Sequence, residues 1–366
     1  MKRFIHIWDL PAEKIYIQFN DKFREKFFDC AYEKFGNWKL LGKNIGIKRA
    51  DTSIARNWRS GNNCYPLSKI FKISEITGIS KKNVETNIAE IKYKTLLNKR
   101  GGSSGKSINN PKFPIKINGD FIEILGHICG DGTICGGLKK GIKTVYVNNE
   151  KKLITNFIKL VQDNMGDIEP SIEIRDDHKK YKKPCYFISY PSIISCILLS
   201  VFEYKIGTDI EIPNYIFKMN KNTRCRFIRA LFDDEGHVSD KHKFIRIGMK
   251  PLIFVNSLNE LLDSIGIKTS GVKTERGMNY LKLCDGKNIT LFYQKINFKH
   301  PTKKIKLENL INKGWKFERF HNGVARERII ELLNLDNNLN ANELASILDR
   351  NPQTIKGHLR NIKNDI

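Results

Sequence analysis

The stretches FIEILGHICGDG (residues 121–132) and FIRALFDDEG (residues 227–236) decide the fold of this 366-residue chain. In both, apolar side chains recur at the three- and four-residue spacing of a buried helix face. Both stretches then close on an acidic residue followed by glycine, Asp131-Gly132 in the first and Glu235-Gly236 in the second. One such ending is a common turn, whereas two in one chain indicate an internal duplication.

The same succession of elements follows each stretch. Two β-prone runs separated by a polar turn come first, and an amphipathic helix ended by glycine follows at residues 150–166 and 251–266. A second strand pair and another apolar helix complete each copy. The pattern predicts an α+β domain at residues 119–314, built from two αββαββα repeats at about 119–213 and 214–314.

Small residues predict that the two motif helices pack closely. Gly126 and Gly130 lie about one turn apart in the first helix, and Ala230 takes the position of Gly126 in the second. Such packing brings Asp131 and Glu235 side by side, where the negative ends of both helices make the pair costly without a cation. A divalent metal shared with a phosphate would offset that cost. The glycine after each acid fits the left-handed position that commonly ends a helix.

The segments ILGHICGDG (124–132) and IRALFDDEG (228–236) resemble the paired motifs of LAGLIDADG homing endonucleases in their two-motif, monomeric form. The resemblance covers roughly residues 119–314 and implies that the repeats form a saddle over double-stranded DNA. It implies Mg²⁺-dependent hydrolysis of both strands at a long, specific target by a monomer with internal pseudo-twofold symmetry. The sequence departs from the motifs at His127, Cys129 and Asp234, which stand where an apolar residue, an acid and a small residue are usual.

The resemblance also assigns the site residues. Asp131 and Glu235 correspond to the catalytic acids and metal ligands, with Gly130 beside them in the metal site. Asp234 directly precedes the second acid and competes with it for the metal role. Lys303 matches the active-site lysine of the second repeat and is the third candidate catalytic residue.

The charge of the chain points to a polyanionic partner. Lys and Arg number 64 against 39 Asp and Glu, a formal net charge of +25, and each basic side chain can neutralise a phosphate. A Lys-rich translation of an A+T-rich genome is the alternative origin of this excess. By the resemblance, the sheets lie along the major groove, where alternate side chains meet the DNA. The candidate contacts in the sheets are Lys139, Lys140, Lys143, Arg175, Lys180, Lys182, Lys183, Lys241, Lys243, Arg246, Lys273, Arg276 and Lys282.

The region before the repeats predicts a second DNA-binding part. Residues 1–98 resemble a repressor-like, all-α helix-turn-helix domain with a recognition helix at 50–59. In that helix Arg56 and Arg59 are expected to meet phosphate and Trp58 to lie in the core. Residues 99–118 are basic, with a Gly/Ser tract, which is typical of a flexible linker.

The region after the repeats predicts a third DNA-binding part. Residues 318–366 resemble a winged helix-turn-helix, with a capping box formed by Asn340 and Glu343 and a helix begun by Pro352. A small helical protein-interaction module is the alternative. The expected DNA contacts in this last helix are Gln353, Thr354, Lys356 and Arg360.

Composition argues against several other classes. No run of about 18 apolar residues is present, which argues against a transmembrane helix, and the first residues lack the apolar core of a signal peptide. We therefore expect a cytoplasmic, nucleoid-associated protein. Its eight cysteines include no Cys-x₂-Cys pair, which favours reduced thiols over a zinc site.

Three other functions share the expected fold. A transcription regulator would use the repeats only to bind DNA, and an RNA maturase would add intron RNA as a partner. An intein would splice, but the sequence begins with Met and its His321-Asn322 pair is followed by glycine, so no splicing is expected. The presence of both motif acids favours the endonuclease over the regulator.

Overall fold

The structure is a computed structural model that describes residues 3–47, 57–93, 107–137, 141–176, 184–201, 210–312, 322–348, 350 and 352–364. The chain forms two compact units, residues 1–313 and residues 314–366. The first unit contains both predicted repeats together with the region that precedes them, and the second is wholly helical where it is described.

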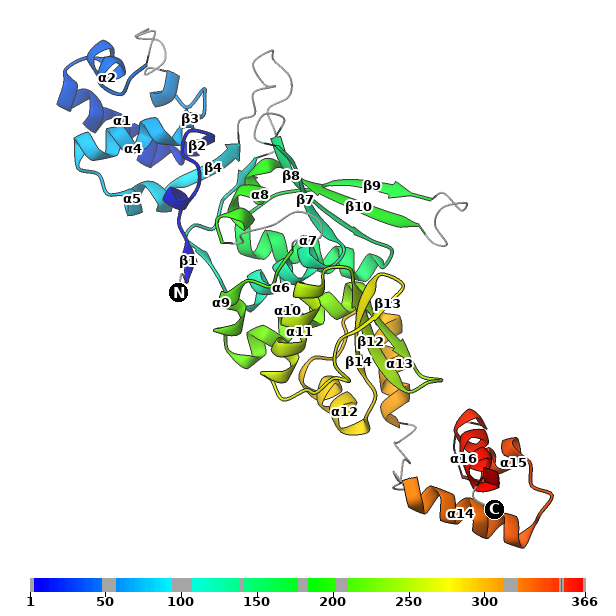
Figure 1. The fold of residues 1–366 in the computed structure, drawn as a ribbon. Coiled ribbons are helices and arrows are strands. Elements are labelled where there is room, and N and C mark those ends of the chain that lie inside the picture. The colour runs from blue at the N-terminus through cyan, green and yellow to red at the C-terminus, as the bar shows by residue number, and fades with distance from the viewer. Residues whose placement is uncertain are drawn as a thin grey trace. The chain divides into compact units, whose positions relative to one another are not determined.

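Two helices form the centre of the first unit. They are α6 (Gly119–Cys129) and α10 (Lys221–Glu235), which lie side by side between the two repeats (Figure 1). Each begins where an asparagine caps the first turn: Asn118 accepts from the N–H of Phe121 (3.0 Å) and Asn220 from that of Thr223 (2.9 Å). The two motif helices therefore pack side by side as the sequence predicts, and α10 begins at Lys221, before the stretch 227–236 that predicted it.

Each central helix leads into a four-stranded antiparallel sheet, as the repeat pattern predicts. The first sheet has the strand order β7-β8-β10-β9 and the second has the order β11-β12-β14-β13. The first repeat contains β7 (Gly132–Gly137), β8 (Gly141–Asn148), α7 (Lys151–Met165), β9 (Ser171–Arg175), β10 (Cys185–Tyr190) and α8 (Ser192–Leu199). The second contains β11 (Gly236–Ser239), β12 (Phe244–Met249), α11 (Leu252–Asp263), β13 (Lys273–Glu275), β14 (Met278–Leu283) and α12 (Gly286–Lys295).

The two sheets begin in the same register. Gly132, the first residue of β7, lies opposite Tyr146, and Gly236, the first residue of β11, lies opposite Ile247. The repeats can therefore be compared position by position, and Tyr146 of the first corresponds to Ile247 of the second. A short helix, α9 (Asn214–Phe217), precedes α10, and a longer one, α13 (Pro301–Asn312), follows the second repeat.

Large apolar side chains fill the space between the helices and the inner face of each sheet. Phe157 and Tyr190 are buried in the first repeat, and Phe227, Phe232 and Phe254 in the second. Burying a side chain of this size contributes about 1.5–3 kcal/mol. These contacts hold the ends of α6 and α10 in place against the first strand of each sheet.

The region before the repeats is not all-helical. It contains a sheet of order β3-β2-β4-β5, next to helices and a separate pair of short strands. The strands β2 and β4 read IYIQF and IAEIKY, whose inward residues are buried apolar side chains. The elements are β1 (Phe4–Ile5), η1 (Ile7–Asp9), β2 (Ile15–Phe19), α1 (Asp21–Phe35), α2 (Trp38–Asn44), β3 (Tyr65–Pro66), α4 (Leu67–Thr77), α5 (Lys81–Thr86), β4 (Ile88–Tyr93), β5 (Ile108–Asn109) and β6 (Ile115–Lys116). The prediction of an all-α domain missed this sheet.

The expected recognition helix at 50–59 lies mostly outside the described residues, and so does Arg56. Residues 57–59 are helical, and Trp58 is buried against Phe28 and Tyr65, as expected of a core residue.

The second half of the expected linker is part of the fold. β5 pairs with β4, and β6 pairs with β1 at the start of the chain. Ile108 and Ile115 are fully buried there, because these strands place apolar side chains against the body of the unit. The prediction of a flexible linker is therefore wrong for residues 107–118, whereas residues 99–106 lie outside the described part.

The second unit is a small helical bundle of α14 (Asn322–Leu335), α15 (Ala341–Ile347) and α16 (Pro352–Asn364). Its core consists of Ile329, Leu344, Ala345, Ile355 and Ile362. The predicted capping box is present: the N–H of Glu343 donates to Asn340 Oδ1 (3.1 Å), and the N–H of Asn340 donates to Glu343 Oε2 (2.8 Å). Within the described residues of either unit, no helix is long and apolar enough to cross a membrane.

Candidate active site between the two repeats

Glycine brings the two central helices into backbone contact. A Cβ atom placed on Gly126 would lie 2.7 Å from the Cβ of Ala230 and 2.7 Å from the carbonyl oxygen of Phe227. A Cβ on Gly130 would lie 2.7 Å from Oδ2 of Asp234. The close approach predicted from these small residues is confirmed, and it brings the C-terminal ends of both helices together.

The glycines after the two acids are required by close contact and not by backbone conformation. Gly236 is extended, with φ −74° and ψ 151°, and Gly132 has no positive φ either. A Cβ on Gly132 would lie 2.4 Å from the Cα of Ile128, and one on Gly236 would lie 2.3 Å from the carbonyl oxygen of Phe232. The expected left-handed conformation is therefore wrong, because each strand starts directly against the last turn of its helix and leaves no room for a side chain.

Asp131 lies half-buried at the end of α6. Its Oδ2 accepts a hydrogen bond from the Asn148 side-chain amide at 2.8 Å. Burial, followed by the negative charges of Asp234 and Glu235, raises the pKa of Asp131 to about 8, against the opposing effect of nearby cations. Glu235 therefore lies close enough to Asp131 for its charge to disfavour ionisation of the Asp131 carboxyl.

Glu235 ends α10 and differs from Asp131 in its surroundings. The residue is exposed, and its carboxylate makes no hydrogen bond or ion pair within the described part of the chain. Partial loss of solvent and the charge of Asp234 raise its pKa, and the cation of Lys303 opposes this effect. Its oxygens are available to a ligand.

Lys303, on α13, binds the end of α10. Its Nζ donates to the carbonyl oxygens of Phe232 (3.2 Å), Asp233 (2.6 Å) and Asp234 (2.9 Å). These three bonds use all three hydrogens of the ammonium group. Burial lowers the pKa of Lys303, while the surrounding carboxylates oppose that effect. The lysine predicted from the sequence thus lies at the site, where it places a positive charge against the negative helix end.

Asp234 does not point toward a free space where a metal would bind. Its side chain is fully buried, and its Oδ2 lies 3.0 Å from Nδ1 of His127. Its Oδ1 accepts from the hydroxyl of Tyr146 (2.8 Å) and from the amide of Asn148 (3.2 Å). We call His127, Tyr146, Asn148 and Asp234 the bridging network, because it joins the two repeats. In the sequence His127 and Asp234 stand as two separate departures from the motif, and no pattern marks Tyr146 or Asn148 as part of the site.

The neighbouring acid Asp233 has a structural contact. Its Oδ1 accepts the backbone N–H groups of Lys299 and His300, each at 2.9 Å. Asp233 stands at the motif position where the first repeat has Cys129, which is also buried. This position is therefore used to hold the chain after α12 and not to line the site.

The acids fit a hard divalent cation. Within the described residues no group of three His, Cys, Asp or Glu side chains has the arrangement of a closed metal site. Mg²⁺, however, is usually bound through one or two carboxylates together with waters and substrate phosphates. Asp131 and Glu235 supply two such carboxylates, and Gly130 ends α6 directly before the first. Asp234 differs from these two acids because both of its oxygens already contact protein side chains, whereas Asp131 has one such contact, from Asn148.

The outer face of the second sheet carries several of the predicted DNA contacts. Arg246 and Lys282 lie opposite each other on β12 and β14. The Arg246 guanidinium lies 4.7 Å from the ring centre of Tyr280, and Lys282 Nζ lies 4.2 Å from that of Phe244. With Lys273 these side chains line a hollow of about 260 Å³. Cations and aromatic rings on one face suit the phosphates and base edges of a nucleic acid.

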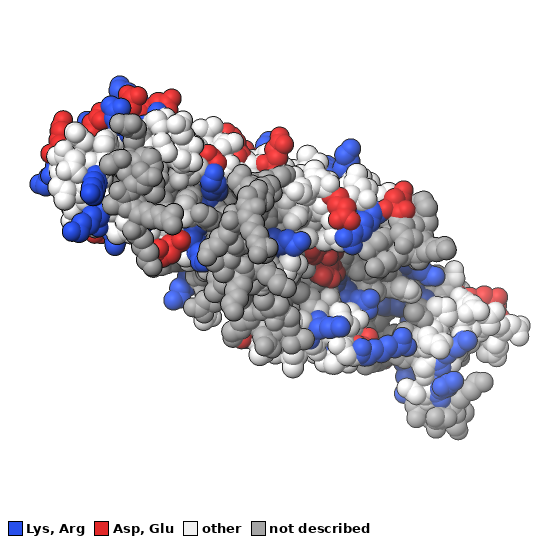
Figure 2. Space-filling view, turned by 90° about the horizontal axis from the view of Figure 1, so that it is seen from above, with Lys and Arg blue, Asp and Glu red and all other residues white. Residues whose placement is uncertain are grey.

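The other predicted contacts are more scattered. Lys143 and Arg175 are exposed on the first sheet, where Arg175 pairs with Glu173 (2.7 Å). Lys241, Lys243 and Arg276 lie in or beside the turns of the second sheet. On the face shown in Figure 2, Lys and Arg side chains are interspersed with Asp and Glu. The predicted contacts that lie outside the described residues are Lys139, Lys140, Lys180, Lys182 and Lys183.

The predicted DNA contacts of the two flanking regions are exposed where the structure describes them. Arg59 is exposed and forms an ion pair with Asp29 at 2.6 Å, so its charge is partly neutralised. In the second unit, the exposed residues of α16 include the four predicted DNA contacts, Gln353, Thr354, Lys356 and Arg360, while Ile355 and Ile362 point into the core.

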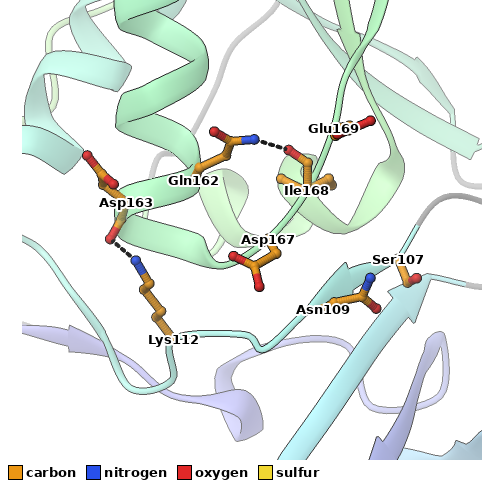
Figure 3. Close-up of a pocket in the computed structure, with 8 residues that line it drawn as sticks. All are labelled: Ser107, Asn109, Lys112, Gln162, Asp163, Asp167, Ile168 and Glu169. Carbon is orange, nitrogen blue, oxygen red and sulfur yellow. Dashed lines mark hydrogen bonds between the residues drawn. The ribbon is translucent and has the colours of Figure 1, made fainter.

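A second hollow, of about 660 Å³, lies between the segment before α6 and the end of α7 in the first unit (Figure 3). Lys112 Nζ donates to the carbonyl oxygen of Asp163 there, at 2.9 Å. Its lining contains three acids, Asp163, Asp167 and Glu169, against the single cation of Lys112. This charge is unsuited to a phosphate backbone, so the hollow is not a DNA contact.

Comparisons with known proteins find a family match in the second repeat. A family model described as the LAGLIDADG-like domain matches residues 222–297, which confirms the predicted resemblance there. The chain is similar to a glutamine–fructose-6-phosphate aminotransferase of Methanocaldococcus jannaschii, at 23% identity over 87% of this chain and 32% of the relative. It is also similar to a probable translation initiation factor IF-2 of Thermococcus kodakarensis, at 21% identity over 81% of this chain and 24% of the relative. The chain thus spans about a third or less of the length of these relatives.

Three solved structures are also similar. The homing endonuclease I-WcaI bound to its DNA recognition sequence shares 18% identity, with 52% of this chain and 87% of that chain covered and a TM-score of 0.42. I-DmoI in complex with DNA and Mn shares 17% identity over 49% and 96%, with a TM-score of 0.37. Full-length DUF199/WhiA from "Thermatoga maritima" shares 16% identity over 67% and 89%, with a TM-score of 0.38.

Proposed function

Since this chain carries a LAGLIDADG-like domain at residues 222–297 and repeats its arrangement of elements from residue 119, we propose that it is a site-specific endonuclease that cleaves both strands of DNA. The observation that carries the proposal is the position of Asp131 and Glu235. Glu235 is the last residue of α10 and Asp131 follows the cap residue of α6, the two helices are in backbone contact, and each acid is followed at once by the first strand of a sheet. Two acids related by the repeat match the two strands of a duplex.

Asp131 and Glu235 would each hold a divalent metal at one of two cleavage centres, Mg²⁺ in our proposal. When bound, such an ion lowers the pKa of a water molecule and stabilises negative charge on a phosphate oxygen. Lys303 supports the site from beneath Glu235: its charge opposes the raised pKa of that carboxyl, and its three hydrogen bonds hold the end of α10. We assign Lys303 an electrostatic role and not that of a proton donor, since its hydrogens are already bonded.

The sheets would position the duplex. In the second sheet Arg246 and Lys282 present positive charge on a face where Phe244 and Tyr280 hold their side chains in place. Contacts of this kind bind phosphates independently of sequence, whereas the side chains between them read base edges. The twin sheets, each attached to one acid, support a long target with a cut near its centre.

The second unit is proposed as an additional DNA contact. The residues Gln353, Lys356 and Arg360 are spaced by three and four positions, so they share one exposed side of α16, and Ile355 anchors the other side. A helix with one polar, basic face on a small bundle is the form that enters a major groove in helix-turn-helix proteins. This unit would lengthen the target beyond the part covered by the sheets.

A DNA-binding regulator that does not cut is the second candidate. It is favoured by the Asn148 amide, whose hydrogen bond at 2.8 Å already occupies one oxygen of Asp131. The reactions named for the curated relatives are not proposed for this chain, which covers only a minor part of those proteins.

One experiment separates the two candidates. Purified protein is incubated with genomic DNA and a randomised plasmid library in Mg²⁺, and DNA ends are mapped by sequencing, with Asp131→Asn and Glu235→Gln proteins as controls. Recurrent paired breaks that disappear with either control support the endonuclease. Selective retention of DNA fragments without any break would replace it with the regulator.

A further inference from the structure

The bridging network belongs to one repeat far more than to the other. His127, Tyr146 and Asn148 come from the first repeat, and only Asp234 comes from the second. By position in the repeat, His127 corresponds to Leu231 and Tyr146 to Ile247. The second repeat thus fills the equivalent places with apolar side chains, and it has no counterpart of this network.

The two repeats also differ at Asn148, the residue that donates a hydrogen bond to Asp131. Asn148 lies two positions after Tyr146 on β8, and the equivalent residue on β12 is Met249. Both side chains are buried. An apolar residue is therefore sufficient to pack this place, so the asparagine is not explained by packing alone.

Polar groups in this position are costly unless they are fully hydrogen-bonded. Asp234 meets this requirement, because His127, Tyr146 and Asn148 all contact its two oxygens. His127 does not, since its Nε2 is buried without a partner among the described residues. The chain keeps a network that an apolar core would make unnecessary, which indicates a role beyond stability.

The orientation of the Asn148 amide is fixed. Its Oδ1 accepts the backbone N–H of Glu150 at 2.9 Å, so its Nδ2 must face the acids. Nδ2 then donates to Asp131 Oδ2 at 2.8 Å and to Asp234 Oδ1 at 3.2 Å. The Asn148 amide that binds Asp131 is therefore fixed by hydrogen bonds at both its oxygen and its nitrogen. Glu235 has no such donor in the described part of the chain.

From this difference we infer that Asn148 is a positioning residue for Asp131, and that the bridging network makes the two cleavage centres unequal. The inference rests on the proposed endonuclease function. Cutting of the strand nearer Asp131 depends on the network, and cutting of the other strand does not. A nicked duplex is then an obligatory intermediate whenever the network is weakened.

The test replaces Asn148 by the residue of the other repeat, Asn148→Met. The substrate is the mapped target with a different dye on each strand, so that the nicking rate of each strand is measured separately. Removing an outer partner of a metal-binding carboxylate commonly lowers activity by about ten- to a hundredfold. We expect that loss on one strand, with the other strand changed less than about threefold, and accumulation of nicked DNA.

Two further variants make the result specific. Asn279→Met removes another buried asparagine, whose amide binds the carbonyl of Lys250 and not an acid, so it controls for general damage to a sheet. Tyr146→Phe removes only the hydroxyl that contacts Asp234, and it keeps the test available if Asn148→Met does not fold. It is expected to slow the same strand by a smaller factor.

A second readout does not depend on cleavage. Binding of Mn²⁺ to the protein–DNA complex is measured from the decrease in the electron paramagnetic resonance signal of free Mn²⁺. Asn148→Met is expected to weaken one class of site by about tenfold and to leave the other unchanged, while DNA affinity in EDTA stays as in the unaltered protein.

The outcomes distinguish a failure of the proposed endonuclease function from a failure of the inference about Asn148. If the unaltered protein cuts no DNA, the proposed function fails and the inference falls with it. If it cuts, and Asn148→Met slows both strands equally or weakens both metal sites equally, the function stands and the inference is overturned.

Discussion

His127 of the first repeat and Asp234 of the second pair across the central helices, with Nδ1 and Oδ2 3.0 Å apart and neither side chain exposed. Each residue departs from the motif, the histidine replacing an apolar residue and the aspartate a small one. Gly130 provides the room for Asp234, since a Cβ there would lie 2.7 Å from Oδ2. The two departures are therefore one feature, a buried pair that links the repeats at the level of the acids.

This pair predicts strong coupling between the two positions. Removing one member of a buried pair leaves the other uncompensated and costs about 3–5 kcal/mol. We expect His127→Leu and Asp234→Ala each to lower the free energy of unfolding by that order, and the double variant to lose much less than the sum. Urea unfolding of the four proteins gives the coupling energy, and additive losses would show that the contact contributes nothing.

A second prediction concerns the stability of the metal-free protein. Burial and neighbouring acids raise the pKa of Asp131 from 3.8 to about 8. The folded chain therefore holds this proton more tightly than the unfolded chain does. The stability that this proton gives is complete below pH 4 and is lost as the pH rises toward 8.

Asp131→Asn should remove that loss. We expect the variant to be more stable than the unaltered protein by several kcal/mol at pH 8, because each unit of pKa difference corresponds to about 1.4 kcal/mol, with the difference vanishing near pH 4. Denaturant unfolding in EDTA across this range measures it, with Asp163→Asn as a control at an exposed acid outside the site. A gain that is independent of pH would contradict the assigned cause.

The sequence predicts the central helices and both sheets because their signals are local. The apolar spacing around Gly126 and the acid-glycine endings define where each helix runs and stops. Close packing was predictable as well, because glycine and alanine at helical spacing allow few other arrangements. The N-terminal sheet was not, since β2 and β4 pair across more than sixty residues, between Ile15 and Tyr93 for example.

The bridging network was hidden for a different reason. Along β8 the sequence alternates Val145 and Val147 with Tyr146 and Asn148, and hydrophobicity alone would place the valines inside. The structure reverses this: Tyr146 and Asn148 are buried and the valines lie on the outer face. The partners that make this possible, His127 and Asp234, come from two other helices, so the pattern of one strand carries no sign of them.

The third prediction concerns Lys303. Lys303→Met removes the charge that opposes the raised pKa of Glu235 and frees three carbonyl oxygens at the end of α10. Cleavage should fall about tenfold or more, because preorganised charge at a site contributes on this scale. Lys304→Met is the matched control. The Lys304 side chain is exposed, and its Nζ lies 3.9 Å from Oε1 of Glu308, a long surface ion pair outside the site. Equal rates for the two variants would remove Lys303 from the site.

The fourth prediction concerns the second sheet. Arg246→Ala and Lys282→Ala should each weaken DNA binding and reduce the slope of log affinity against log salt by about one. Lys287→Ala, on the exposed side of α12, should leave both unchanged. Titrations of labelled DNA at several salt concentrations measure the slope, and an unaltered slope for Arg246→Ala would place the DNA elsewhere.

The central claim is that Asp131 and Glu235 are the metal-binding acids of a DNA endonuclease, one at each of its two cleavage centres. The most direct measurement compares the unaltered protein with Asp131→Asn and Glu235→Gln on the same mapped DNA in Mg²⁺, scoring cleavage and binding in parallel. We predict paired breaks at one recurrent site for the unaltered protein, no paired breaks for either variant, and DNA affinity retained by all three. Full cleavage by either variant, or binding without breaks by the unaltered protein, would contradict the account.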